Sequence, residues 1–145
     1  MPYKNLEITT SNYSNQHTVA RNHIYKGFST VDPTNYGGKL FDFDLIKQDI
    51  INHFNTRKGE RVMNPTFGTI VWDLIMEPLT DQIKDLLTND ITTICNFDPR
   101  VSPLEIKINE YEQGYLVELT LLMKSTDETS TLRLAFDQAI GLRVQ

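Results

Sequence analysis

The chain has 145 residues, of which 39% are hydrophobic and 23% are charged, a composition that excludes collagen, a coiled coil and wholesale disorder. Its single cysteine excludes an intramolecular disulfide, and its net charge of -5 has the wrong sign for a protein whose main role is to neutralise phosphates. There is no apolar run of about 20 residues that could cross a bilayer and no signal-peptide core. We therefore expect no nucleic-acid or membrane partner, and a protein that stays in the cytoplasm unless a larger assembly carries it out.

The first 40 residues form an arm that differs from the rest of the chain. Four basic and two acidic side chains give this arm a charge of +2, which leaves -7 on residues 41–145. From residue 9 to residue 18 nearly every side chain is polar. Apolar residues alternate between Ile24 and Phe28, which predicts a short strand, and turns are expected at 31–33 and 36–38. We expect this arm to lie as an extended strand on a neighbour or on the body of the protein.

Three helices are expected after the arm. The first has Asp42 or Asp44 as its N-cap, ends before Thr56 and has one apolar face, made of Ile46, Ile50 and Phe54. A short helix is expected at 70–76, after an irregular loop at 60–68. The third helix begins after Thr80 and ends at Asp98, and its apolar stripe is formed by Ile83, Leu86, Leu87, Ile91, Ile94 and Cys95.

The hydrophobic period then changes from that of a helix to that of a strand. Alternating apolar residues predict strands at 104–108, 115–123 and 132–136. The fold class is therefore α+β, with three main helices packed on a small antiparallel β-meander and preceded by an extended polar N-terminal arm. We divide the chain into the arm, residues 1–40, which contains a short strand, and one α+β domain, residues 41–145.

Few residues offer enzymatic chemistry. The histidines and Cys95 lack the spacing of a zinc site, and no glycine-rich phosphate loop or nucleophile elbow is present. We therefore predict no catalytic, cofactor-binding or metal-binding residues. Glu60, Asp73 and Glu77 flank Trp72 and could supply the two carboxylates of a glycosidase, but 19 acidic residues create such pairs by chance.

Two polar segments allow either a structural or a docking interpretation. In the segment 57–68, Arg61 either locks the loop or contacts a partner. At 98–100, Asp98, Pro99 and Arg100 form either a helix stop with a solvated ion pair or a rigid corner that presents a charged anchor. We expect Arg100 to anchor the domain more than it stabilises the fold.

Four motifs in order resemble one known family. Thr56–Arg61, Asn64–Thr69, Glu77–Thr80 and Phe97–Val101 are similar to the "lysozyme-like" baseplate wedge family of contractile-tailed phages and type VI secretion systems. The resemblance implies a subunit that docks on the helical core bundle of the wedge and nucleates the first sheath ring. The Glu-Pro-Arg corner of the family becomes Asp98, Pro99 and Arg100 here, which with Arg61 form our predicted docking set. No glycosidase motif supports the lysozyme name.

The main hypothesis is therefore a structural protein of the tail baseplate in a virion that is assembled in the host cytoplasm. Its expected partners are other wedge subunits and the tail sheath protein, with tail tube or hub proteins as further candidates. The last predicted strand is the expected platform for the sheath by strand pairing. We expect Leu132, Leu134 and Phe136 to face the helices and Thr131, Arg133 and Ala135 to face outward.

Two alternatives remain. One is a peptidoglycan-degrading muramidase. The other is a regulatory adaptor, because an anti-adaptor family that protects a stress sigma factor shares the domain. The phage-like segment between Tyr25 and Pro33 counts against the adaptor.

Overall fold

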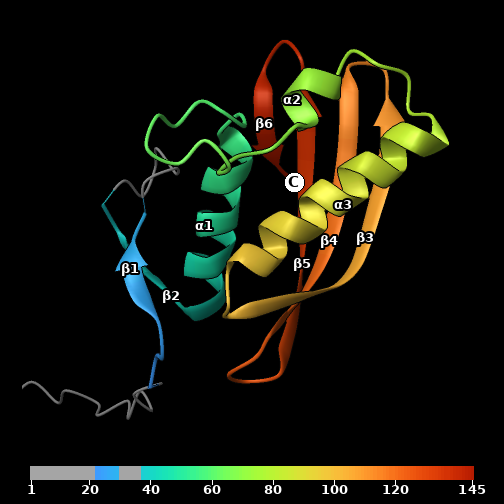
Figure 1. Cartoon of the computed structure of the whole chain (residues 1–145). Coiled ribbons are helices and arrows are strands. Elements are labelled where there is room, and N and C mark those ends of the chain that lie inside the picture. The colour runs from blue at the N-terminus through green and yellow to red at the C-terminus, as the bar shows by residue number, and fades with distance from the viewer. Residues whose placement is uncertain (1–21, 30–36) are drawn as a thin grey trace, which may run out of the picture.

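The computed structural model describes residues 22–29 and 37–145, and every statement about the structure refers to those residues. Three helices and two antiparallel sheets confirm the predicted α+β class (Figure 1). The elements in chain order are β1 (Lys26–Phe28), β2 (Lys39–Phe41), α1 (Asp42–Asn55), α2 (Val71–Leu74), α3 (Asp81–Phe97), β3 (Val101–Tyr111), β4 (Gly114–Met123), β5 (Glu128–Asp137) and β6 (Gly141–Val144).

The larger sheet is a meander in which β3, β4, β5 and β6 are neighbours in that order. The helices α1 and α3 cross one face of this sheet (Figure 1). The alternation in β4 agrees with this arrangement, because from Tyr115 to Met123 the odd-numbered residues are buried and the even-numbered residues are only partly covered. The core therefore lies between the helices and one sheet face. Its largest members include Phe54 from α1, Ile91 from α3, Tyr115 from β4 and Phe136 from β5.

The two long helices begin in different ways. Thr80 caps α3 as predicted, since its hydroxyl accepts a hydrogen bond from the Ile83 amide at 3.4 Å. Neither Asp42 nor Asp44 caps α1, and this prediction is wrong: Phe41 occupies the N-cap position without a side-chain hydrogen bond. Asp42 instead has a φ of 46°, a conformation that non-glycine residues seldom adopt.

The carboxylate of Asp42 fastens the arm to the domain. It accepts hydrogen bonds from the amides of Ile24 and Tyr25 at 2.9 and 3.0 Å, and it lies 2.9 Å from Nδ1 of His23. The hydrogen bond from the Tyr25 amide, followed by that from His23, lowers the pKa of Asp42. At the start of α1, the Asp42 carboxylate therefore bonds to the segment that leads into β1 and does not cap the helix.

The arm contributes a hairpin that packs on α1. The strand predicted near Ile24–Phe28 is present as β1. Its partner β2 spans the boundary between the arm and the domain, a pairing that we did not predict. Gly27 lies directly against Leu45 of α1, which leaves no room there for a side chain without movement of Leu45. The polar run at 9–18 and the turn at 31–33 lie outside the described residues.

Three expectations about single positions are wrong. Leu104 is 56% exposed because the register of β3 shifts between Pro103 and Glu105, which breaks the alternation. Leu86 is exposed although it belongs to the predicted stripe of α3. Ala135 is 1% exposed rather than outward-facing in solvent, because the unpredicted strand β6 pairs beside it and sets Arg143 opposite it.

No helix among the described residues combines the length and the apolar character that a membrane crossing requires.

The prediction that Leu132, Leu134 and Phe136 face the helices is confirmed, since all three are buried. The ring of Phe136 meets Phe54 of α1 and Trp72 of α2 edge to face, at centroid distances of 5.6 and 5.4 Å. This contact ties the end of β5 to both helices.

Candidate docking site at the end of the third helix

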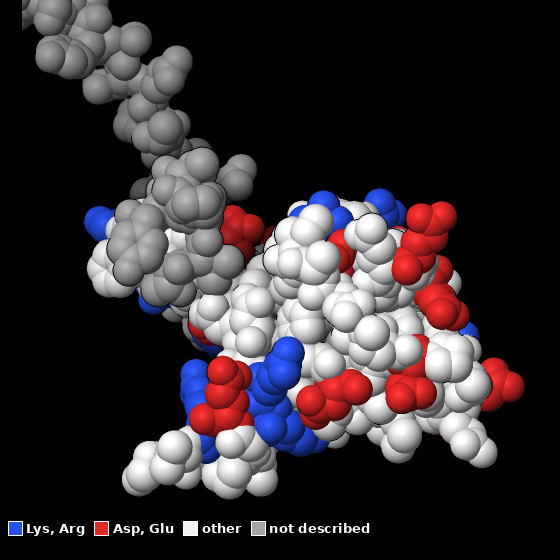
Figure 2. Space-filling view, turned by 90° about the horizontal axis from the view of Figure 1, so that it is seen from above, with Lys and Arg blue, Asp and Glu red and all other residues white. Residues whose placement is uncertain are grey.

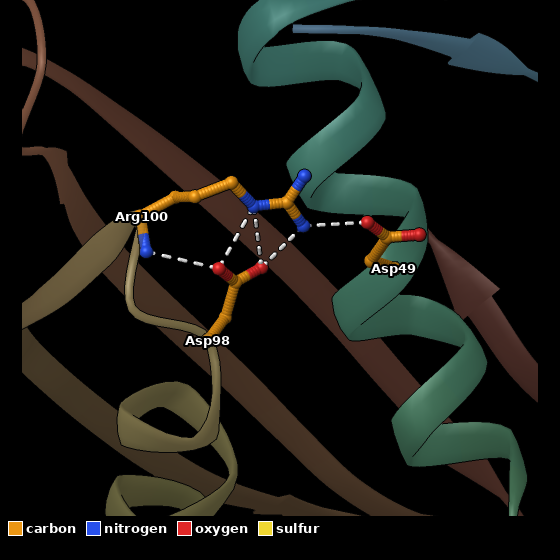
Figure 3. Close-up of polar contacts among 3 residues, drawn as sticks. All are labelled: Asp49, Asp98 and Arg100. Atoms are coloured by element: carbon orange, nitrogen blue, oxygen red, sulfur yellow. Dashed lines mark hydrogen bonds and ion pairs between the residues drawn. The ribbon is translucent and has the colours of Figure 1, made fainter.

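The corner after α3 is held together by one arginine. Arg100 donates from Nε to both carboxylate oxygens of Asp98, at 2.8 and 3.1 Å, and from Nη2 to Oδ2 of Asp98 at 2.5 Å (Figure 3). The same Nη2 donates to Oδ2 of Asp49 on α1 at 2.6 Å. The backbone amide of Arg100 closes the turn by donating to Asp98 at 3.0 Å. The guanidinium thus joins α1 to the α3–β3 corner.

The charges at this corner stabilise one another. Burial disfavours the ionised Asp98 carboxylate, but the hydrogen bonds from Arg100 outweigh burial and hold its pKa below the ordinary value. The hydrogen bond to Asp98 likewise raises the pKa of Arg100. The Arg100 and Asp98 side chains are 24% and 12% exposed, whereas Asp49 is 47% exposed. Arg100 therefore links the corner to α1 within the domain, and its expected role as an anchor to a partner stays a prediction.

The predicted irregular loop between α1 and α2 is fixed by a buried carboxylate. Asp90 of α3 accepts hydrogen bonds from Lys58 Nζ, from the Thr69 hydroxyl and from the Ile70 amide, at 2.8, 2.8 and 3.0 Å. Within the loop, the Gly59 amide donates to the Pro65 carbonyl at 2.8 Å. Both ends of the loop are thus tied to α3, and sequence reasoning did not single out Asp90.

Gly68 permits the close approach of the two ends of this loop. Its φ is 119°, and a side chain there would lie 2.6 Å from the backbone carbon of Arg57. The Thr69 amide donates to the Thr56 carbonyl, and Arg57 and Thr69 form an isolated bridge. Glycine at position 68 is therefore required by backbone packing.

Arg61 lies on an aromatic stack that leads to the corner. Its guanidinium is 3.8 Å from the ring centre of Phe67, which stacks on His53 of α1 at 3.8 Å. Phe97, the last residue of α3, meets His53 and Phe67 edge to face at 5.3 and 5.8 Å. Since Asp98 follows Phe97 directly, this chain of contacts brings all four predicted docking residues to one end of α3.

The three carboxylates that could serve a glycosidase, Glu60, Asp73 and Glu77, are not gathered in one site. Glu60 and Asp73 are exposed, and Glu60 accepts a hydrogen bond from the Arg57 amide at 2.9 Å within its own loop. Glu77 lines a separate hollow of about 330 Å³ with Glu110 and Glu112. Among the described residues, no group of three or more His, Cys, Asp or Glu side chains is placed to hold a metal ion.

The predicted sheath strand has two unlike halves. From Leu134 to Asp137, β5 pairs with β6 on one side and with β4 on the other. From Glu128 to Leu132, the described residues provide only β4 as a neighbour, so this half of β5 is an open edge. The carbonyl of Arg133 accepts from the Gln145 amide at 3.0 Å and marks the boundary. We name residues 128–132 the open half of β5.

Comparison with known proteins identifies relatives of this chain. A profile of the family described as baseplate wedge protein gp25 matches residues 42–133. Baseplate wedge protein gp25 of Enterobacteria phage T4 is 26% identical over 93 residues, which cover 61% of this chain and 70% of that protein. The family match runs from α1 into β5.

Solved structures share the fold. A crystal structure of a Geobacter sulfurreducens protein named for tail lysozyme matches with a TM-score of 0.54 and 24% identity, over 61% of this chain and 83% of that one. A chain of the anti-feeding prophage baseplate matches with a TM-score of 0.57 and 20% identity, over 68% and 85%. Because the family profile spans more than half of the chain, from α1 into β5, this protein belongs to the baseplate wedge protein gp25 family.

Proposed function

We propose that this chain is a structural component of a contractile-tail baseplate wedge, which docks on the wedge core bundle and initiates sheath assembly by strand pairing. The observation that carries the proposal is the family match over residues 42–133, a segment that contains both the corner after α3 and the open half of β5. The other wedge subunits and the sheath protein are its partners in this proposal, and the tail baseplate of a phage or phage-like particle is its location.

The corner after α3 suits docking because it is built before a partner arrives. Arg100 holds Asp98 and Asp49 in fixed positions, and Pro99 lies exposed between the two residues that form the ion pair. A side chain that is already ordered loses little rotamer freedom on binding. In this proposal the partly exposed Asp49 and the exposed Pro99 meet the core bundle, and Arg100 acts by keeping the corner rigid.

Incorporation into wedges tests the docking role of the corner. Arg100→Ala is expected to lower association with the other wedge subunits by about tenfold or more, at a temperature where circular dichroism confirms that it is folded. Arg143→Ala is the matched control, because Arg143 also contacts an aspartate but lies on β6. Normal incorporation of folded Arg100→Ala would contradict the docking role.

The open half of β5 suits strand pairing. In an antiparallel strand, the amide and carbonyl of one residue point to the same side, and alternate residues repeat that direction. Because the Arg133 carbonyl points toward the β6 side, Thr131 directs its amide and carbonyl to that side as well. A partner strand can bond to these groups without displacing β6. The buried Leu132 and Leu134 hold the strand against the core.

A proline at position 131 separates a backbone role from a side-chain role. Thr131→Pro removes the outward amide while the bonds to β4 remain, and an edge strand tolerates such a proline. We expect sheath assembly on baseplates to fail with folded Thr131→Pro and to proceed with Thr131→Ala. Sheath growth on both variants would exclude this edge from the sheath interface.

A further inference from the structure

The loop at residues 61–64 has an unusual turn. The Asn64 amide donates to the Arg61 carbonyl at 3.3 Å, so Val62 and Met63 occupy the two central positions of the turn. Such positions usually carry Gly, Asn, Asp, Pro or Ser. Here Val62 and Met63 are 93% and 96% exposed, more than any other large hydrophobic residue among the described ones. We name these two residues the loop tip.

Backbone hydrogen bonds and side-chain contacts hold the loop beneath this tip. The Gly59 amide bonds to the Pro65 carbonyl across the loop, and the Phe67 amide donates to the Asn64 carbonyl at 3.2 Å. Below the tip, Arg61 rests on the Phe67 ring at 3.8 Å, and Lys58 is held by Asp90. The backbone beneath the tip is thus ordered before binding, and an ordered backbone loses little conformational entropy when it binds.

The surroundings of the tip are basic although the domain is acidic. Arg57, Lys58 and Arg61 outnumber Glu60 in the loop, whereas residues 41–145 carry a net charge of -7. The loop lies on the left of Figure 1. In the view from above, Lys and Arg gather on that side next to a protruding uncharged group, and most Asp and Glu lie elsewhere (Figure 2). The matching surface on a partner would combine an apolar depression with surrounding carboxylates.

We infer that the loop tip inserts into an apolar depression bordered by Asp and Glu on another subunit of the baseplate wedge. The inference rests on the proposed wedge function and adds a second contact, next to the corner after α3. In this contact, Val62 and Met63 supply the buried apolar anchor, while Arg57 and Arg61 pair with the surrounding carboxylates. Methionine suits the anchor position because its unbranched side chain adapts to irregular depressions.

Association with isolated wedges, reconstituted from the other wedge subunits, tests the inference. Val62→Asn combined with Met63→Asn keeps side chains that turns accept and removes the apolar anchor. We expect this double variant to unfold like the wild type and to associate about tenfold or more weakly. Met76→Asn combined with Ile140→Asn is the matched control, since both are exposed large hydrophobic residues outside the loop. The control is expected to associate normally.

The charge component has its own readout. Arg57→Gln combined with Arg61→Gln should flatten the decline of association with increasing salt, because fewer ion pairs form at the edge of the contact. Normal association of the tip variant, or an equal loss in the Met76 and Ile140 control, would overturn the inference. If the tip variant or the arginine variant loses binding to duplex DNA but associates normally with wedges, the loop is assigned to nucleic acid and the inference is overturned as well. If the wild-type chain itself fails to join wedges, the proposed function falls instead.

Discussion

Arg100 connects three parts of the molecule through a single guanidinium group. It bonds to Asp98 at the end of α3 and to Asp49 on α1, and it lies 5.4 Å from the ring centre of Tyr25 in the arm. Removing the guanidinium leaves Asp98 largely buried without its cation. Such a loss costs more than that of an exposed ion pair, since the remaining carboxylate is poorly hydrated.

We therefore expect Arg100→Ala to lower the free energy of unfolding by about 2 kcal/mol. Arg100→Lys should recover part of this loss, because lysine keeps the charge but not the planar arrangement of donors. Denaturant unfolding of both variants provides the measurement. An unchanged unfolding midpoint in Arg100→Ala would mean that these internal contacts add little stability and that Arg100 acts mainly as a docking anchor.

His53 makes the stability of the domain depend on pH near neutrality. Burial between Phe67 and Phe97 lowers its pKa, a shift that the nearby Asp90 charge opposes only in part. The unfolded chain therefore binds a proton more readily than the folded one as the pH falls below the ordinary value of 6.5. Stability from neutral His53 is fully present above that pH and is lost as the pH falls toward the lowered pKa.

The expected result is a free energy of unfolding that declines as the pH falls below the ordinary histidine value of 6.5. In His53→Gln this decline should be smaller, because glutamine does not titrate. Urea unfolding at several pH values measures both slopes. Equal slopes in the two proteins would mean that His53 does not titrate differently in the folded and unfolded chains.

At the scale of an element, the loop between α1 and α2 depends on α3. Asp90 holds Lys58, Thr69 and Ile70, so its loss frees the loop before the rest of the domain unfolds. We expect Asp90→Ala to lower the free energy of unfolding by about 3 kcal/mol and to speed tryptic cleavage in the loop. Asp85→Ala, on the exposed face of the same helix, is the control. Cleavage at equal rates in both variants would contradict this role.

How much could be read from the sequence differs between elements. The stripe of α3 and the alternation of β4 repeat over many residues, so their faces could be predicted. Asp90 also left a signal, since it lies between Leu87 and Ile94 at the spacing of the buried stripe. A carboxylate in such a stripe requires partners, but the sequence does not name them.

Other features depend on contacts between distant segments. β2 and β6 contain only three and four residues, too few to establish a period. Because β6 was not predicted, the burial of Ala135 beside it was not predicted either. Asp49 was overlooked because its exposed helical position looks like any solvated charge until Arg100 reaches it. Asp98, Pro99 and Arg100 are consecutive, whereas Arg61 is linked to them only through the contacts of Phe67 with Phe97, which the sequence does not show.

For the whole molecule, we predict a role in assembly and no glycosidase activity. A retaining or inverting glycosidase requires two carboxyl groups on opposite sides of one bond. Glu60 is bonded within its own loop, and Glu77 lines a different part of the surface. We expect purified protein to leave peptidoglycan suspensions unclarified. Clarification that persists through repurification and disappears in Glu60→Gln or Glu77→Gln would establish a muramidase.

In the proposed function, the half-covered strand β5 also limits the registers in which a sheath strand can pair with it. A strand that pairs along an entirely open edge can slip by two residues and still keep its side chains on the same face. Here β6 occupies the positions from Leu134 to Asp137, so an added strand that slips in that direction collides with it. The strand β6 therefore acts as an end stop. In the proposed function, this stop gives every copy in the baseplate ring the same axial offset, so that the first sheath ring starts level.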